Sequence, residues 1–176
     1  MPVRSIPVLI LFFISFGMKA GFNYDAKAGL IMERILELRF KEAQDLIQIE
    51  KKKDPANKLP LLYENYIDFL TNSIAEERTF FYQSQKKKRD RINKLKEDTG
   101  KSSPWYLHCE AEIELQWAFS RLKFGEQVSA AKEINTAYKL LQENLKANPG
   151  FLPSLKSMGL LQCLIALAVS DRHHPG

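Results

Sequence analysis

Hydrophobic residues recur at intervals of three and four positions through most of the chain, which is the spacing of amphipathic α-helices. The first such stripe runs through Ala28, Ile31, Ile35 and Leu38. No segment alternates apolar and polar residues as a half-buried strand does. The sequence therefore predicts an all-α fold of about seven helices. They are expected over residues 25–38, 40–53, 60–74, 75–98, 104–124, 126–147 and 153–169.

Helix-breaking residues separate most of these segments. Asp54-Pro55, Gly100, Gly125 and Asn148-Pro149-Gly150 each mark a helix end, because proline and glycine interrupt the helical backbone. The short connections predict antiparallel helical hairpins. No strong breaker follows Leu38, so one long helix over residues 25–53 is the alternative to two.

Two segments share one spacing. In each, a large apolar residue lies four positions after a small one, and a proline lies eight positions after the large residue. They are Ala43, Ile47 and Pro55, and Ala137, Leu141 and Pro149, and the second is followed by Leu155, Met158 and Gly159. In these positions the chain resembles the tetratricopeptide repeat (TPR) family. The resemblance implies a short TPR-like solenoid whose last repeat is incomplete. Arg34 and Gln162 stand where the family prefers an aromatic residue, and the hairpin over residues 60–98 carries no match.

The resemblance also implies a binding site. In the family, the first helices of successive repeats line a concave groove that receives a protein or peptide segment. Carried onto this chain, the groove residues are Tyr63, Asn65, Tyr66, Trp105, His108, Glu112 and Gln116. The alternative for the aromatic residues is a place in the hydrophobic core.

The N-terminal segment, residues 1–21, has the pattern of a secretory signal peptide. Arg4 precedes an apolar run over residues 6–16, and small residues follow, whereas a membrane-spanning helix needs about 20 apolar residues. Cleavage is favoured over an uncleaved anchor. The sequence therefore predicts export to the periplasm or the cell exterior, with a helical domain over residues 22–169.

The last helix is very apolar, and residues 170–176 have no periodicity and are expected to be a disordered tail. No later helix is present to cover the apolar surface of the last helix. The favoured explanation is a truncated product of a longer gene. Docking into another subunit and packing on a membrane remain open.

The composition is that of a globular domain, with 45% hydrophobic and 27% charged residues among 176. The formal net charge of +5 includes Arg4 and Lys19, so it is smaller in a cleaved chain. That excess is too small to indicate nucleic acid, although weak contact with an anionic membrane is compatible with it. The basic run over residues 86–91 is interpreted first as a solvated helix face and second as a lipid contact.

The sequence predicts no catalytic residues, no metal site and no cofactor. His108 and Glu112 could share a helix face, but two ligands do not make a zinc site. Cys109 and Cys163 could form a disulfide or remain two buried thiols. The leading hypothesis is an exported, non-enzymatic adaptor or assembly factor that binds a protein or peptide. The alternatives are a membrane-peripheral protein and an exported hydrolase of unknown type.

Overall fold

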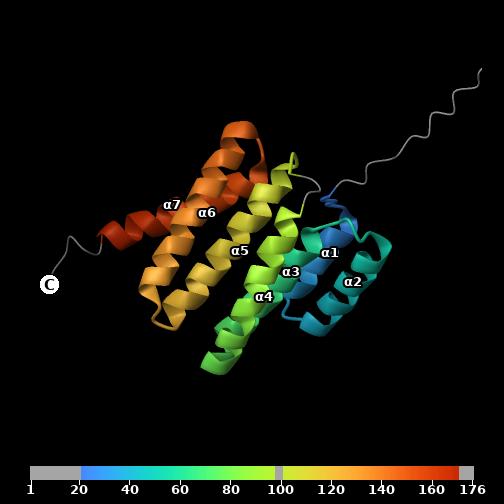
Figure 1. Ribbon diagram of the computed structural model, residues 1–176, viewed down its shortest axis with the longest axis horizontal. Helices are drawn as coiled ribbons and strands as arrows, with labels where there is room; N and C mark the ends of the chain where they lie inside the picture. Colours follow the sequence, from blue (N-terminus) through green and yellow to red (C-terminus); the bar gives the residue numbers. More distant parts are fainter. Residues whose placement is uncertain (1–20, 98–100, 171–176) are drawn as a thin grey trace, which may run out of the picture.

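The computed structural model describes residues 21–97 and 101–170. These residues form seven α-helices and no strand, which confirms the all-α prediction (Figure 1). The helices are α1 (Ala26–Leu36), α2 (Phe40–Lys53), α3 (Leu59–Ala75), α4 (Arg78–Lys96), α5 (Pro104–Lys123), α6 (Gln127–Ala147) and α7 (Leu152–Ser170). The predicted signal peptide, except Gly21, lies outside the described residues. So does the tail predicted over residues 170–176, except Ser170, which is the last residue of α7.

Consecutive helices pack side by side and run in opposite directions, as Figure 1 shows. α1 packs on α2, α3 on α4 and α5 on α6. The odd-numbered helices also follow one another in contact, α1 with α3, α3 with α5 and α5 with α7. Each even-numbered helix in turn contacts the odd-numbered helix that comes after it. α3 and α5 therefore occupy the middle of the molecule.

The residues of the repeated spacing lie in the core. Ala43, Ile47, Ala137 and Leu141 are all completely buried. Their burial agrees with the general rule that small side chains let two helices approach while large ones fill the neighbouring space. Around Leu141 a separate hydrophobic cluster joins three helices; its other buried members are Ala111, Leu115, Ala137, Met158 and Leu161.

The turn between α1 and α2 rules out a single long helix over residues 25–53. Leu38 adopts the left-handed conformation with φ of 60°, which glycine usually provides at a helix end. The amide of Arg39 donates to the carbonyl of Arg34 at 2.9 Å, and the amide of Leu38 donates to that of Ile35 at 3.0 Å. These two bonds close the end of α1 without glycine, so the sequence carries no conventional signal for the break.

The second half of α4 is more buried than its composition suggests. From the sequence, this half of the helix is expected to protrude or lie exposed, because Ile92 and Leu95 are its only hydrophobic residues. The structure corrects this expectation, since Arg91 and Leu95 are both buried. Ion pairs with neighbouring helices and the buried side chains of Phe81 and Leu95 hold α4 in place. Within residues 21–97 and 101–170, no helix combines the length and hydrophobicity that a membrane crossing requires.

Core packing around α6 gives a direct test of the fold. Leu141→Ala is expected to lower the free energy of unfolding by about 2–5 kcal/mol, because it leaves a cavity between three helices. Leu36→Ala is the matched control, since Leu36 is 67% exposed and its truncation should change stability by no more than about 0.5 kcal/mol. Urea denaturation followed by circular dichroism measures both. Equal losses in the two variants would contradict the core placed around Leu141.

Candidate functional site

A groove with a volume of about 850 Å³ opens along the odd-numbered helices. It receives residues from α1, α3, α5 and α7 and from the segment that precedes α1. Its lining residues are Tyr24, Met32, Leu62, Tyr63, Tyr66, Trp105, His108, Glu112, Leu152, Pro153, Leu155, Lys156, Ser157 and Leu160. Because four helices contribute to it, the groove exists only in the assembled fold.

Aromatic rings form one part of the groove. The ring of Tyr24 stacks on Trp105, with centroids 4.9 Å apart and an interplanar angle of 12°. The edge-to-face pair of Trp105 and Phe151, with centroids 5.1 Å apart, fixes the indole from another side. Such pairs prefer these offset or edge geometries and add to the stabilisation from burial. The groove thus presents a preorganised aromatic surface.

The carboxylate of Glu112 lies among this apolar lining. The hydroxyl of Tyr66 donates to Glu112 Oε2 at 2.6 Å, and the hydroxyl of Ser157 donates to Glu112 Oε1. Burial, and then the neighbouring carboxylate, raise the pKa of Tyr66 well above its usual range. Tyr66 therefore stays protonated and donates at neutral pH. The two hydroxyls come from α3 and α7, so they hold Glu112 of α5 between its neighbours.

His108 is buried one helical turn before Glu112. Its Nδ1 lies 3.3 Å from the hydroxyl of Ser154. Burial lowers the pKa of His108, and the opposing effect of Glu112 is the smaller one. The imidazole is therefore neutral at pH 7.

The Ser154 and His108 pair is the arrangement closest to a hydrolytic nucleophile among the described residues. Ser154 is completely buried, and Asn144 Nδ2 donates to its hydroxyl at 2.8 Å. A nucleophile must reach the substrate. The pair is therefore structural.

Five of the seven residues proposed for the groove line it, namely Tyr63, Tyr66, Trp105, His108 and Glu112. The other two, Asn65 and Gln116, lie in the interior. Asn65 is completely buried, and its Nδ2 donates to Gln116 Oε1 at 2.7 Å. Gln116 is buried as well, so neither side chain is accessible to a partner.

Sequence reasoning missed Tyr24 and the whole contribution of α7. Tyr24 precedes the first helix, where helical periodicity gives no information. In α7 apolar residues occur on every side, so the pattern could not indicate which of them face the groove. Leu155 and Leu160 line it and remain exposed.

Asn65 also connects α3 to α4. Its Oδ1 accepts from Trp117 Nε1 and from Arg91 Nη1, both at 3.1 Å. Arg91 in turn pairs with Asp68 at 2.6 Å. One amide thus joins three helices through a connected set of buried hydrogen bonds, which is costly to disrupt because each lost partner leaves a buried polar group unpaired.

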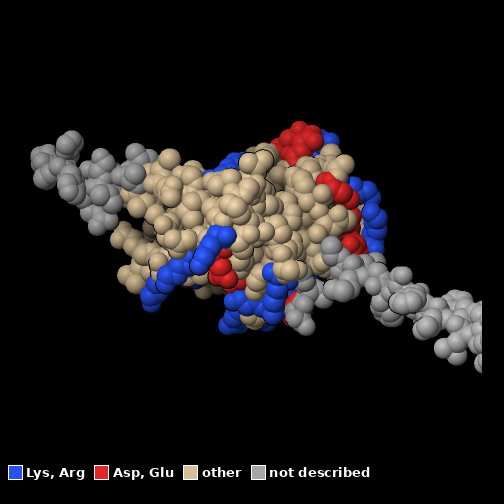
Figure 2. Space-filling model, turned by 90° about the horizontal axis from the view of Figure 1, so that it is seen from above, with Lys and Arg blue, Asp and Glu red and all other residues tan. Residues whose placement is uncertain are grey.

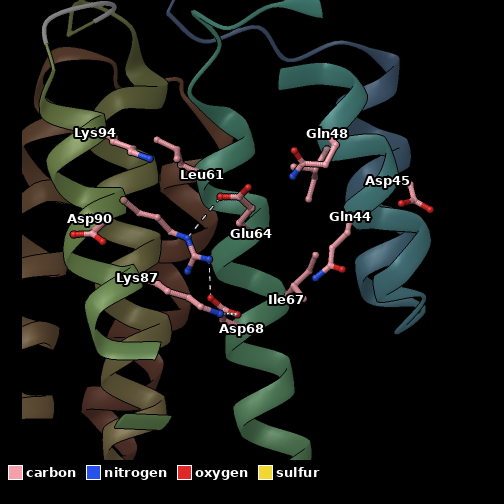
Figure 3. A pocket seen from close by; sticks show the side chains of 12 residues that line it. Gln44, Asp45, Gln48, Leu61, Glu64, Ile67, Asp68, Lys87, Asp90 and Lys94 are labelled. Carbon is pink, nitrogen blue, oxygen red and sulfur yellow. Dashed lines mark hydrogen bonds and ion pairs between the residues drawn. The ribbon is translucent and has the colours of Figure 1, made fainter. Parts of the chain in front are cut away.

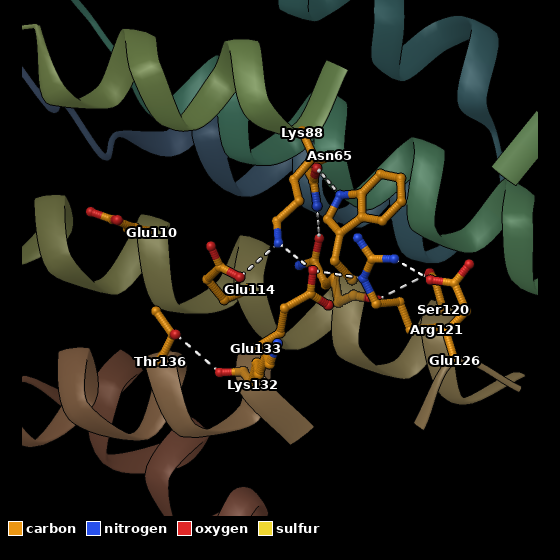
Figure 4. Close-up of polar contacts among 12 residues, drawn as sticks. Asn65, Lys88, Glu110, Glu114, Ser120, Arg121, Glu126, Lys132, Glu133 and Thr136 are labelled. Carbon is orange, nitrogen blue, oxygen red and sulfur yellow. Dashed lines mark hydrogen bonds and ion pairs between the residues drawn. The ribbon is translucent and has the colours of Figure 1, made fainter. Parts of the chain in front are cut away.

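The basic run over residues 86–91 is only partly a solvated helix face. Lys86 and Arg89 are exposed, but Lys88 points between two carboxylates, Glu114 at 2.7 Å and Glu133 at 2.6 Å (Figure 4). Burial raises the pKa of Glu114 although Lys88 opposes this effect. Arg121 continues the cluster by pairing with Glu133 at 2.8 Å and also with Glu126.

A second depression, of about 540 Å³, lies between α2 and α4 above α3 (Figure 3). Gln44 and Gln48 face it from α2, and Lys87 and Lys94 from α4. Its floor carries ion pairs, since Asp68 binds both Arg91 and Lys87. Charges that are already paired offer little to a ligand. The aromatic groove is therefore the stronger candidate site.

Seen from above, the middle of the molecule is covered mainly by residues other than Lys, Arg, Asp and Glu, and the charged side chains lie mostly toward its edges (Figure 2). A face with few cations offers little to the phosphate backbone of nucleic acid. The described residues hold no group of three or more His, Cys, Asp or Glu side chains placed to bind a metal ion.

The disulfide proposed between Cys109 and Cys163 is not formed, because both thiols are free. Cys109 is completely buried in the cluster shared with α1 and α3, whereas Cys163 is exposed on α7. The alternative of two buried thiols is correct for Cys109 alone. Burial raises the pKa of Cys109 well above its usual range.

The cysteines give one prediction. In the native protein, one thiol per chain, that of Cys163, should react rapidly with a disulfide reagent such as DTNB, because the thiolate is the reactive form and Cys109 is neither ionised nor accessible. The second thiol should react only after denaturation. Cys163→Ser should abolish the rapid reaction. Two rapidly reacting thiols, or none, would contradict the structure.

His108 gives a pH dependence. The unfolded chain binds a proton near the usual histidine pKa of about 6.5, whereas the folded chain resists it, so the unfolded state binds more protons as the pH falls. The free energy of unfolding should therefore decrease below about pH 6.5, and the decrease should be smaller in His108→Gln. Urea denaturation at several pH values between 5 and 8 measures the difference. Parallel pH profiles for the two proteins would contradict it.

Comparison with protein-family models, with curated proteins and with solved structures found no match to this chain. Its function is therefore inferred from the groove and from the residues that line it.

Proposed function

We propose that this chain is an exported, non-enzymatic TPR-like protein that holds a segment of a protein partner in the groove along its odd-numbered helices. Its role is that of an adaptor or assembly factor. Export is proposed from the pattern of residues 1–21, and the binding role is proposed from the groove.

The order of helix contacts supports a short solenoid. In stacked hairpins the first helix of each unit packs on the first helix of the previous unit and on the second helix between them. The contacts of α3 and α5 follow this order, and α7, which contacts α5 and α6, occupies the place of a first helix. The burial of the residues in the repeated spacing supports the same proposal.

The observation that carries the proposal is the composition of the groove. All four odd-numbered helices line it, and its volume falls in the range of about 300–1,000 Å³ typical of ligand sites. Aromatic residues such as Trp105 and Tyr66 offer a wide apolar area with one polar group, which is why they dominate binding energies at interfaces. Exposed leucines of α7 extend this surface.

Two other functions have less support. A hydrolase would need an accessible nucleophile, and Ser154 beside His108 is buried. Attachment of the basic helix to an anionic membrane would depend on the exposed Lys86 and Arg89, because Lys88 and Arg91 are already paired with carboxylates. The groove therefore supports the binding of a protein segment better than it supports either of these two functions.

A peptide-binding experiment tests the proposal. Peptides of twelve residues selected from a random phage-displayed library on the purified protein should bind in the groove. Leu160→Gln should weaken their binding about tenfold, because Leu160 lines the groove and is 56% exposed, so a partner would bury it. Fluorescence polarisation with labelled peptides measures the affinity.

Val128→Gln is the matched control. Val128 is 72% exposed on α6 and lies outside the groove, so the same polar side chain there should leave the affinity unchanged. Failure to select any peptide, or selected peptides whose binding ignores Leu160→Gln, would exclude the proposed groove.

A further inference from the structure

We propose that the groove recognises a basic side chain, arginine or lysine, of the bound segment through the carboxylate of Glu112. This inference rests on the proposed function and adds the chemistry of the partner. It depends on the surroundings of Glu112, which differ from those of every other acidic residue on α5.

The acidic residues of α5 show the difference. Glu110 pairs with Lys96 at 2.8 Å, and Glu114 pairs with Lys88 at 2.7 Å. Glu112, between them in sequence, faces the groove and makes no ion pair with any residue in the described part of the chain. α5 therefore places two of its acids against cations of the fold and leaves the third to the groove.

The two hydroxyls that bind Glu112 orient it without neutralising it. Tyr66 donates to one oxygen and Ser157 to the other. An ionised carboxylate offers about four acceptor positions, so about two remain for a ligand. A cationic donor in that place would make charge-assisted hydrogen bonds, which are shorter and stronger than neutral ones. Tyr66 and Ser157 thus act as positioning residues for a cation site.

The walls of the groove suit the rest of a basic side chain. Lysine and arginine carry apolar stems that pack on hydrophobic surface, and their charged groups are attracted to the faces of aromatic rings. Tyr24, Tyr66 and Trp105 provide such rings in the lining that contains Glu112. A basic side chain can therefore bury its stem against the aromatic wall while its charge reaches Glu112.

Other charges along the groove do not satisfy Glu112. Lys156 is the single Lys or Arg among the lining residues, and it is exposed and makes no ion pair with Glu112. His108 is kept neutral by burial. Glu112 is therefore the single carboxylate among the lining residues, and no cation of the lining pairs with it.

The test uses four mixtures of synthetic peptides. Every peptide is twelve residues long and has apolar residues spaced as on one face of a helix. The mixtures differ only at one central position, which is Arg, Lys, Gln or Glu. The mixtures with Arg and Lys should bind the wild-type protein at least about tenfold more tightly than the mixture with Gln. The preference should decrease with added salt, because it depends on charge.

Variants assign the preference to Glu112. Glu112→Gln should remove the preference for Arg and Lys while leaving the affinity for the Gln mixture within about twofold, because the shape of the groove is retained. Glu143→Gln is the matched control, because Glu143 is exposed on α6 outside the groove, and it should keep the preference. Circular dichroism and thermal unfolding show whether each variant is folded. If Glu112→Gln does not fold, Glu112→Asp takes its place in this test.

The outcomes separate this inference from the proposed function. Equal binding of all four mixtures, or a preference that persists in Glu112→Gln, would overturn the inference that Glu112 recognises a basic side chain. Either result would leave the proposed binding in the groove intact. Binding of none of the mixtures would overturn both.

Discussion

The register between α3 and α5 is the constraint on which the rest of the structure depends. Asn65 fixes it, because its amide donates to Gln116 and accepts from Trp117 and Arg91 in a completely buried place. A slip of α3 along α5 would leave these groups unpaired in a medium of low dielectric constant. The same register brings Tyr66, the next residue of α3, to Glu112, one turn before Gln116. The interior bonds and the groove therefore depend on one alignment of two helices.

Enclosed ion pairs help to hold α4 against its neighbouring helices. α4 has few apolar residues, yet Lys88 and Arg91 tie it to carboxylates of α3, α5 and α6. Removing one partner of such an enclosed pair leaves the other charge buried and uncompensated, which is more damaging than loss of an exposed pair. The exposed pairs of Arg34 and Arg39 at the first turn contribute far less. The position of α4 thus depends on a few enclosed ion pairs together with the completely buried side chains of Phe81 and Leu95.

Much of the fold could be predicted from the sequence because the signals are local. Ser103 caps α5 and Gly125 ends it with φ of 82°, as serine before proline and glycine after a helix indicate. The turn at Leu38 could not be predicted, because a leucine takes the conformation that glycine normally adopts. The inward direction of Lys88 was equally hidden, since its acidic partners lie 26 and 45 residues further along the chain.

The sequence by itself determined that the chain is helical, where most helices begin and end, and five of the residues that line the groove. The tertiary structure alone decided that Asn65 and Gln116 face each other in the interior while Tyr66 and Glu112 meet at the groove. The physical reason is that helical periodicity defines the faces of a helix but not their neighbours. Which helix covers each face depends on contacts between residues far apart in the chain, and only the assembled packing specifies them.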